Sequence, residues 1–236
     1  MTELRTVLFD LDGTLADTAP DLAFALNALL GEHGRPKLPY ERIRPEASHG
    51  ARALLRLGFG ITPDDQGYDA LRCRFLDLYG ANLCRNTRLF PGVSELLEAL
   101  PQRGLGWGIV TNKPERYTLP LLAQLQLHPG AVICPDHVPS SKPDPAGLLL
   151  ACQQLDRCVH ASLYVGDHER DIEAGRRAGM GTVAVSWGYT LEGDDPKRWR
   201  ADHLIQHPQQ LSSLFHLIED SSCTITRPHP SSSKTR

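Results

Sequence analysis

The feature that most constrains this chain is a repeated alternation of short apolar runs with helical patterns. The first run, residues 4–10, is rich in β-branched and aromatic side chains and predicts a buried strand. Four further strands are expected at residues 107–111, 131–134, 162–166 and 182–187. Helices are expected between them, at residues 92–100, 115–126, 145–155 and 168–178. The alternation predicts an α/β fold, in which a parallel sheet has helices on both faces and binds ligands at the carboxyl ends of its strands.

One long segment interrupts this alternation. Residues 18–83 contain no convincing strand, and their apolar residues follow helical spacing. The segment is too long to be a simple crossover connection between two strands. We therefore expect a helical cap domain at residues 18–83, inserted into a core formed by residues 1–17 and 84–220. Residues 221–236 lack apolar content and predict a disordered tail.

The charge balance narrows the classes of partner. The chain carries 25 Lys and Arg against 28 Asp and Glu, a formal net charge of −3, which excludes a strongly basic nucleic-acid binder. No apolar run approaches the roughly 18 residues of a membrane span, and the charged N-terminus does not resemble a signal peptide. We expect a cytoplasmic protein with reduced cysteines, a small-molecule partner, and no nucleic-acid or membrane partner.

Two carboxylates follow the first predicted strand. Asp10 ends the strand, and Asp12 comes two residues later, before Gly13 and Thr14. A solvated acid beside an Asp-Gly turn is the structural alternative. That alternative explains Asp12 but leaves Asp10 at a strand end without a purpose, so we interpret the pair as part of a ligand site.

Polar residues also follow three later strands. Thr111 and Asn112 end the second strand, and Lys142 follows the third. Asp167 ends the fourth strand, and Asp171 lies four residues later on the same side of the next helix. Because the carboxyl ends of parallel strands meet at one edge of a sheet, we expect these side chains to converge with Asp10 and Asp12.

The four segments together resemble the motifs of the haloacid dehalogenase-like hydrolase superfamily. They are Asp10-Leu-Asp-Gly-Thr, Val110-Thr-Asn-Lys, Ser141-Lys-Pro-Asp-Pro, and Gly166-Asp with Asp171. The resemblance covers residues 4–219. It implies a Rossmann-like core with an inserted helical cap of the C1 type, and a phosphatase that works through an aspartyl-phosphate intermediate.

The residue types suit that chemistry. The Asp10 carboxylate is the candidate nucleophile, because a carboxylate can attack phosphorus and divide one hard displacement into two easier ones. Asp12 is the candidate general acid and base. The charge of Lys142 and the hydroxyl of Thr111 would stabilise the phosphoryl oxygens. We expect Asn112 to contact the substrate.

A cation must screen the attack of one anion on another. Mg²⁺ prefers carboxylates, waters and phosphate oxygens as ligands. Asp10, Asp167 and Asp171 would supply these oxygens, Asp171 either directly or through a water, and the resemblance adds the backbone carbonyl of Asp12. We therefore expect Mg²⁺ as the cofactor.

The predicted cap carries one segment that suits an anion. Ser48, His49 and Gly50 have the pattern of a helix start, with Arg52 in the first turn. We expect His49, Gly50 and Arg52 to contact a carboxylate or sugar oxygens of the leaving group. The alternative is that Arg52 simply solvates a helix of the cap.

The resemblance implies that the substrate is a small carboxylated or sugar phosphate. The general pattern is similar to bacterial phosphoglycolate phosphatases. The segment Ser48-His-Gly-Ala-Arg52-Ala, with residues 187–202, is similar to the phosphatases of N-acetylmuramic acid 6-phosphate, which act in cell-wall recycling. We expect the second substrate, with phosphoglycolate as the alternative. A hexose-phosphate mutase and an inactive binding protein remain open, and the chain is expected to be a monomer or a homodimer.

Overall fold

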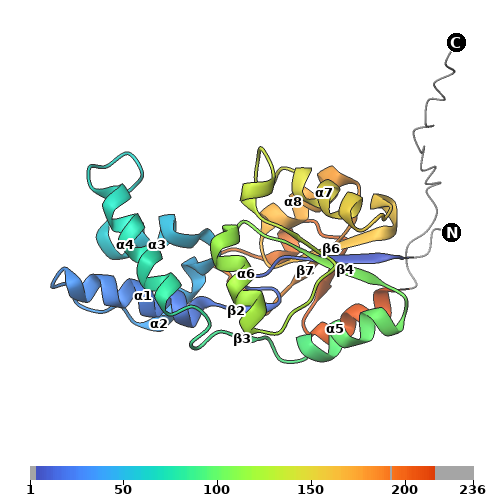
Figure 1. Cartoon of the computed structure of the whole chain (residues 1–236), viewed down its shortest axis with the longest axis horizontal. Helices are drawn as coiled ribbons and strands as arrows, with labels where there is room; N and C mark the ends of the chain where they lie inside the picture. Colours follow the sequence, from blue (N-terminus) through green and yellow to red (C-terminus); the bar gives the residue numbers. More distant parts are fainter. Residues whose placement is uncertain (1–3, 192, 216–236) are drawn as a thin grey trace, which may run out of the picture.

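The structure is a computed structural model that describes residues 4–191 and 193–215. Within these residues six strands form one parallel sheet, which Figure 1 shows at the centre of the core. The strands are β1 Thr6–Phe9, β4 Gly106–Val110, β5 Ala131–Ile133, β6 Ser162–Gly166, β7 Gly181–Val185 and β8 His203–Ile205. Their order is β5-β4-β1-β6-β7-β8, and each neighbouring pair is parallel. The predicted α/β class is confirmed.

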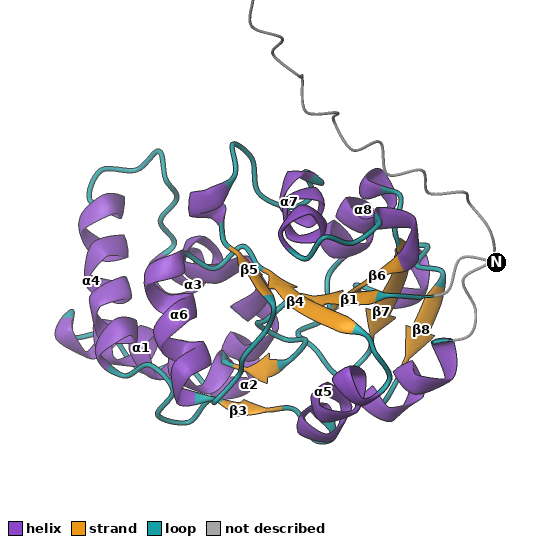
Figure 2. Cartoon of the chain, turned by 45° about the vertical axis from the view of Figure 1, so that its right-hand side comes forward, coloured by secondary structure: helices purple, strands orange, loops and turns teal. Residues whose placement is uncertain are grey.

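Alternate residues of the central strand face opposite helical layers, as the period of two in a strand requires. Leu8 packs in the apolar cluster that contains residues of α7 (Ala146–Gln154) and α8 (Glu169–Ala178). Val7 and Phe9 pack in the cluster that contains residues of α5 (Val93–Gln102). Figure 2 shows α7 and α8 on one side of the sheet and α5 on the other. Helices therefore cover both faces of the sheet. The ends of the strands are the places where polar residues can meet a ligand.

Three short strands were missed by the sequence analysis. The edge strand β8 has three residues, and β2 (Ala16–Asp17) pairs with β3 (Arg88–Leu89) over two residues each. Segments of two or three residues are too short to show a period of two. The antiparallel pair of β2 and β3 joins the place where the chain leaves the core to the place where it returns.

All regular elements that the structure describes between β2 and β3 are helical. They are α1 Ala19–Glu32, α2 Tyr40–Ile43, the 3₁₀ helix η1 Arg44–His49, α3 Gly50–Phe59 and α4 Tyr68–Ala81. Leu26 and Leu29 of α1 and Phe75 of α4 are fully buried in one cluster. Figure 1 shows these helices together at one end of the molecule, beside α6 (Glu115–Gln124). We propose that they form the cap expected at residues 18–83.

Several sequence expectations concern other parts of the chain. The tail expected at residues 221–236 lies outside the described residues. Within the described part, no helix has the length and apolar character needed to cross a membrane. Cys158 is disulfide-bonded, so the expectation of reduced cysteines is wrong for this residue. The expectation rested on the absence of an export signal. It holds for Cys73, Cys84, Cys134 and Cys152, which are free.

Candidate functional site

Three carboxylates meet at the carboxyl ends of β1 and β6. Asp10 follows β1, Asp167 follows β6, and Asp171 lies in the first turn of α8. One oxygen atom of each residue lies within 4.8 Å of the other two. Asp167 and Asp171 are almost completely buried. The fold therefore brings together the three carboxylates that the sequence analysis expected to hold a metal ion.

Two glycines allow the backbone to approach these carboxylates closely. Gly13 has a φ of +84°, and a Cβ atom there would overlap the carboxylate of Asp167. A Cβ atom at Gly166 would overlap Asp171. A side chain at either position would displace a carboxylate, so these glycines are part of the site's construction.

Lys142 bridges two of the three carboxylates. Its Nζ lies 2.9 Å from Asp10 Oδ1 and 2.8 Å from Asp171 Oδ1, and it donates to the Tyr164 hydroxyl at 2.8 Å. The side-chain amide of Asn112 donates to the Lys142 carbonyl and accepts from the Lys142 N–H, both at 3.1 Å. Asn112 therefore fixes the loop that carries the lysine, a contact the sequence analysis did not foresee.

Burial and mutual repulsion make the acidic group hard to ionise. Burial raises the pKa of Asp10 to about 6; Lys142 opposes this shift, while Asp171 adds to it. Burial, followed by the charges of Asp10 and Asp171, raises the pKa of Asp167 to about 8. A divalent cation among the three carboxylates would offset both effects with its positive charge. Three carboxylates and nearby backbone carbonyls are a donor set that fits Mg²⁺.

Asp12 lies beside this group and has different partners. Lys113 Nζ donates to Asp12 Oδ1 at 2.9 Å, and the Thr18 hydroxyl donates to the same oxygen. Lys113 Nζ also lies 4.7 Å from the ring centroid of Tyr79, on α4. The sequence analysis assigned no role to Lys113. Its position directly after Asn112, at the end of a predicted strand, could have indicated that it belongs to the site.

The helices between β2 and β3 (α1, α2, η1, α3 and α4), together called the helical layer from here on, contact the site through two residues of η1. The Ser48 hydroxyl donates to Asp167 Oδ2 at 3.1 Å. His49 Nε2 lies 3.3 Å from Nε2 of His168, the residue after Asp167. The structure therefore shows the helices closed over the carboxylates. Gly50, with a φ of +64°, begins α3 after these contacts.

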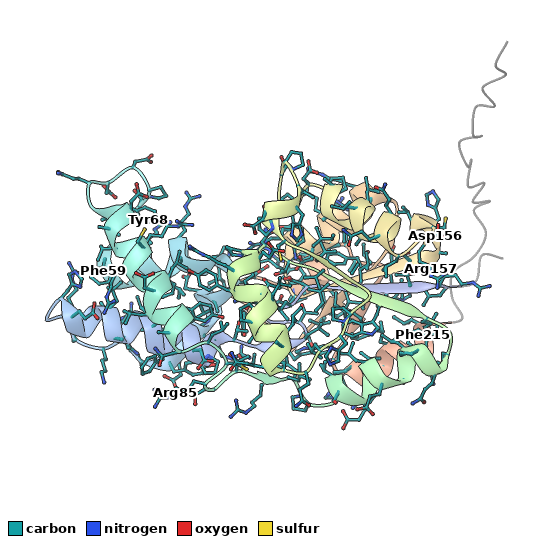
Figure 3. The ribbon with its side chains drawn as sticks, in the orientation of Figure 1. Phe59, Tyr68, Arg85, Asp156, Arg157 and Phe215 are labelled. Carbon is teal, nitrogen blue, oxygen red and sulfur yellow. The ribbon has the colours of Figure 1, made fainter. Side chains whose placement is uncertain are left out.

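A cavity of about 300 Å³ lies between the helical layer and the sheet. Its lining includes every residue expected to act on the substrate: Asp10, Asp12, His49, Gly50, Arg52, Thr111, Asn112 and Lys142. Asp167 and Asp171 are buried and are not among the lining residues. Tyr68 of α4, labelled in Figure 3, also lines the cavity. The predicted residues from the core and from the helical layer thus share one cavity.

A second cavity of about 940 Å³ adjoins the first. The two share five lining residues, all of them cationic or able to become so: His49, Arg52, Lys142, His168 and Arg170. Arg52 is exposed at this junction. The site therefore offers a phosphate-sized end beside Asp10 and a wider, positively charged end.

Comparison with known proteins agrees with this geometry. The family described as haloacid dehalogenase-like hydrolase matches residues 7–185. The chain belongs to this family. It is 46% identical to an N-acetylmuramic acid 6-phosphate phosphatase of Pseudomonas putida, over 90% of this chain and 96% of that protein. It is 45% identical to a phosphoglycolate phosphatase of Xanthomonas campestris, over 88% of this chain and 94% of that protein.

A solved structure shares the fold of this family member. The crystal structure of a predicted phosphoglycolate phosphatase from Haemophilus somnus superposes with a TM-score of 0.81 at 27% identity. The match covers 91% of this chain and 99% of that one. The family and these relatives together identify the chain as a phosphatase of the haloacid dehalogenase-like hydrolases.

Proposed function

We propose that the chain is an Mg²⁺-dependent phosphate-monoester hydrolase in which Asp10 becomes phosphorylated. The observation that carries this proposal is the position of Asp10. It lines the cavity, is ion-paired to Lys142, and belongs to a carboxylate group that suits a divalent cation. A nucleophile placed beside a fixed positive charge is what attack on a phosphoryl group requires.

The first step transfers the phosphoryl group. An Asp10 oxygen forms a bond to phosphorus while the bond from phosphorus to the ester oxygen breaks. Asp12 gives its proton to the departing ester oxygen, which leaves as an alcohol. Lys142 and the Thr111 hydroxyl stabilise the phosphoryl oxygens during the transfer.

The second step releases phosphate. Asp12, now a carboxylate, takes a proton from a water molecule whose oxygen attacks the phosphorus of the aspartyl-phosphate. The bond between phosphorus and Asp10 breaks, inorganic phosphate leaves, and both aspartates return to their initial states.

Mg²⁺ would be held by Asp10, Asp167, Asp171 (directly or through a water) and the Asp12 backbone carbonyl. Its charge would offset the repulsion between the nucleophile and the phosphate. The raised pKa values of Asp10 and Asp167 support this assignment, since their common cause is negative charge confined in a buried place.

We propose N-acetylmuramic acid 6-phosphate as the substrate. The relative at 46% identity carries that name, and cavities of this size accept ligands much larger than glycolate. The cationic junction formed by Arg52 and Arg170 would face the carboxylate of such a sugar. Phosphoglycolate is the second candidate, favoured by the relative at 45% identity.

A side-by-side assay tests both substrates. We expect kcat/KM with Mg²⁺ to be higher for N-acetylmuramic acid 6-phosphate, and the Asp10→Asn variant to lose activity on both esters. A phosphoglycolate value larger by orders of magnitude would reverse the order. If the reaction yields an isomeric sugar phosphate instead of inorganic phosphate, the chain is a mutase. A chain inert on a generic aryl phosphate as well would be a binding protein.

A further inference from the structure

Tyr79 presents a buried hydroxyl whose proton has no acceptor among the described residues, since its neighbour, the Lys113 ammonium, can only donate a hydrogen bond. Its side chain lies on α4, is 2% exposed, and lines the cavity that contains Asp10 and Asp12. An unpaired buried hydroxyl is costly, and folded proteins keep few of them. At the wall of a substrate cavity, such a group is a candidate to bind the substrate.

The surroundings of Tyr79 place it beside the reacting bond. Lys113 Nζ lies 4.7 Å from the Tyr79 ring centroid and 2.9 Å from Asp12 Oδ1. Asp12 is the group we propose to protonate the ester oxygen. Tyr79 therefore stands next to the first atoms of the leaving group rather than at the exposed end of the cavity.

The polar groups at this place are donors. Lys113 is a buried ammonium that is 8% exposed, and burial raises the pKa of Tyr79 to about 12, so that its phenol keeps its proton at neutral pH. The side-chain oxygen and nitrogen of Asn112 are already paired with the Lys142 backbone. A leaving group with an oxygen acceptor here would satisfy the Tyr79 hydroxyl, whereas a purely hydrocarbon group would leave it unpaired.

We infer that Tyr79 is a specificity-determining residue. Its hydroxyl donates a hydrogen bond to a substrate oxygen on the carbon next to the esterified carbon. This inference rests on the proposed phosphatase function. The selected class is phosphate esters that carry oxygen at this adjacent carbon. A hexose 6-phosphate carries its ring oxygen there, and phosphoglycolate carries its carboxylate there. Because Tyr79 belongs to the helical layer, this selection operates when the layer is closed over the site.

Tyr79→Phe tests the inference because it removes only the hydroxyl. Cyclohexylmethyl phosphate is the reference ester, since it keeps a six-membered ring and a primary ester but has no adjacent oxygen. For the variant we expect kcat/KM on N-acetylmuramic acid 6-phosphate and on phosphoglycolate to fall about tenfold or more, with less than about a twofold change on the reference ester. The melting temperature should change by no more than a few degrees, because Lys113, the neighbour of the deleted hydroxyl, keeps its hydrogen bond to Asp12.

Tyr117→Phe is the matched control. Its ring packs 5.6 Å from that of Tyr79, centroid to centroid, but its hydroxyl is not among the buried unpaired groups. The ratio of kcat/KM between the oxygenated and reference esters should change by less than about twofold in this variant. The inference would be overturned if Tyr79→Phe lowered kcat/KM equally on all esters, or if it left kcat/KM on the oxygenated esters unchanged.

A binding measurement separates this inference from the proposed function. In the Asp10→Asn chain, calorimetry gives Kd for N-acetylmuramic acid 6-phosphate and cyclohexylmethyl phosphate, with Tyr79 present or changed to Phe. If Tyr79→Phe raises Kd for the sugar phosphate but not for cyclohexylmethyl phosphate, the inference is supported even if the wild-type chain hydrolyses nothing. An unchanged ratio of the two Kd values, or binding of neither ester, overturns it whatever the hydrolytic activity.

Discussion

At the scale of single residues, the site separates two aspartates by their surroundings. Asp10 faces Lys142 and two other carboxylates, whereas Asp12 faces Lys113 and Thr18. The two carboxylates are two residues apart in sequence, yet one belongs to the proposed metal group and the other to the leaving-group side. This division suits one nucleophile and one proton carrier.

Asp12→Asn should therefore affect turnover more than binding. Asparagine keeps the shape of the side chain but cannot carry the transferred proton, so kcat should fall about 10²–10⁴-fold. KM and the Mg²⁺ dependence should stay close to those of the wild type. Steady-state kinetics on N-acetylmuramic acid 6-phosphate measures all three, and a kcat near the wild-type value would remove Asp12 from the mechanism.

At the scale of elements, one arginine ties the helical layer to the core. Arg44 begins η1 and donates to the Gly188 carbonyl at 3.0 Å. Its guanidinium lies 4.9 Å from the ring centroid of Tyr189 and 3.6 Å from Asp17 of β2. Arg44 thus spans from η1 to the strand pair at the base of the insertion and to the loop after β7.

Arg44→Met should loosen this closure. Methionine keeps apolar contact with Tyr189 but loses the hydrogen bond and the ion pair. Because the ion pair is partly exposed, we expect the closed arrangement to lose about 1 kcal/mol or less of stabilising free energy. This loss should appear as a rise in KM of up to about fivefold, with kcat less affected. Hydrogen exchange should increase in α2, η1 and α3. Unchanged KM and unchanged exchange would show that Arg44 does not hold the layer closed.

At the scale of the whole molecule, the carboxylate group links metal, pH and stability. The pKa values of Asp10 and Asp167 lie near 6 and 8 in the folded chain, above their usual range. The folded chain therefore holds more protons than the unfolded chain, and this contribution to stability is lost as pH rises through the folded pKa values. His168 has the opposite sign, because its pKa is lowered to about 4. Its effect is confined to pH values below its usual pKa.

Without divalent cations, the melting temperature should fall by a few degrees between about pH 6.5 and about pH 8.5. Mg²⁺ should restore it, and more strongly at the higher pH, because the cation binds the ionised carboxylates. Thermal unfolding with Mg²⁺ or with a chelator measures this. Asp167→Asn is the control, since it removes the group with a pKa of about 8 and should flatten the slope. A wild-type slope of the opposite sign would contradict the prediction.

The sequence predicted most of the sheet and the convergence of four side chains. Asp10 and Asp167 follow strands, Asp171 lies in the first turn of a helix, and Lys142 lies in the loop between β5 and α7. The carboxyl ends of parallel strands meet at one edge of the sheet, so the proximity of these residues follows from topology. Their catalytic roles stay proposals.

Contacts that cross between layers could not be predicted in this way. Tyr79 shares the helical spacing of its segment, and nothing in this spacing shows that the residue lines a cavity. Ser48 donates a hydrogen bond to Asp167 although the two residues are 119 positions apart in the sequence. Such contacts depend on how the helical layer rests on the sheet, which local periodicity does not encode.

The strand pair of β2 and β3 has a consequence for evolution and engineering. The two ends of the helical insertion, at Asp17 and Arg88, are already hydrogen-bonded neighbours. An insertion whose two ends are neighbours can be replaced by one of another length without moving the strands of the sheet. Under the proposed function, related chains can acquire new leaving-group preferences by exchanging this insertion, while the proposed phosphate chemistry of the core is kept.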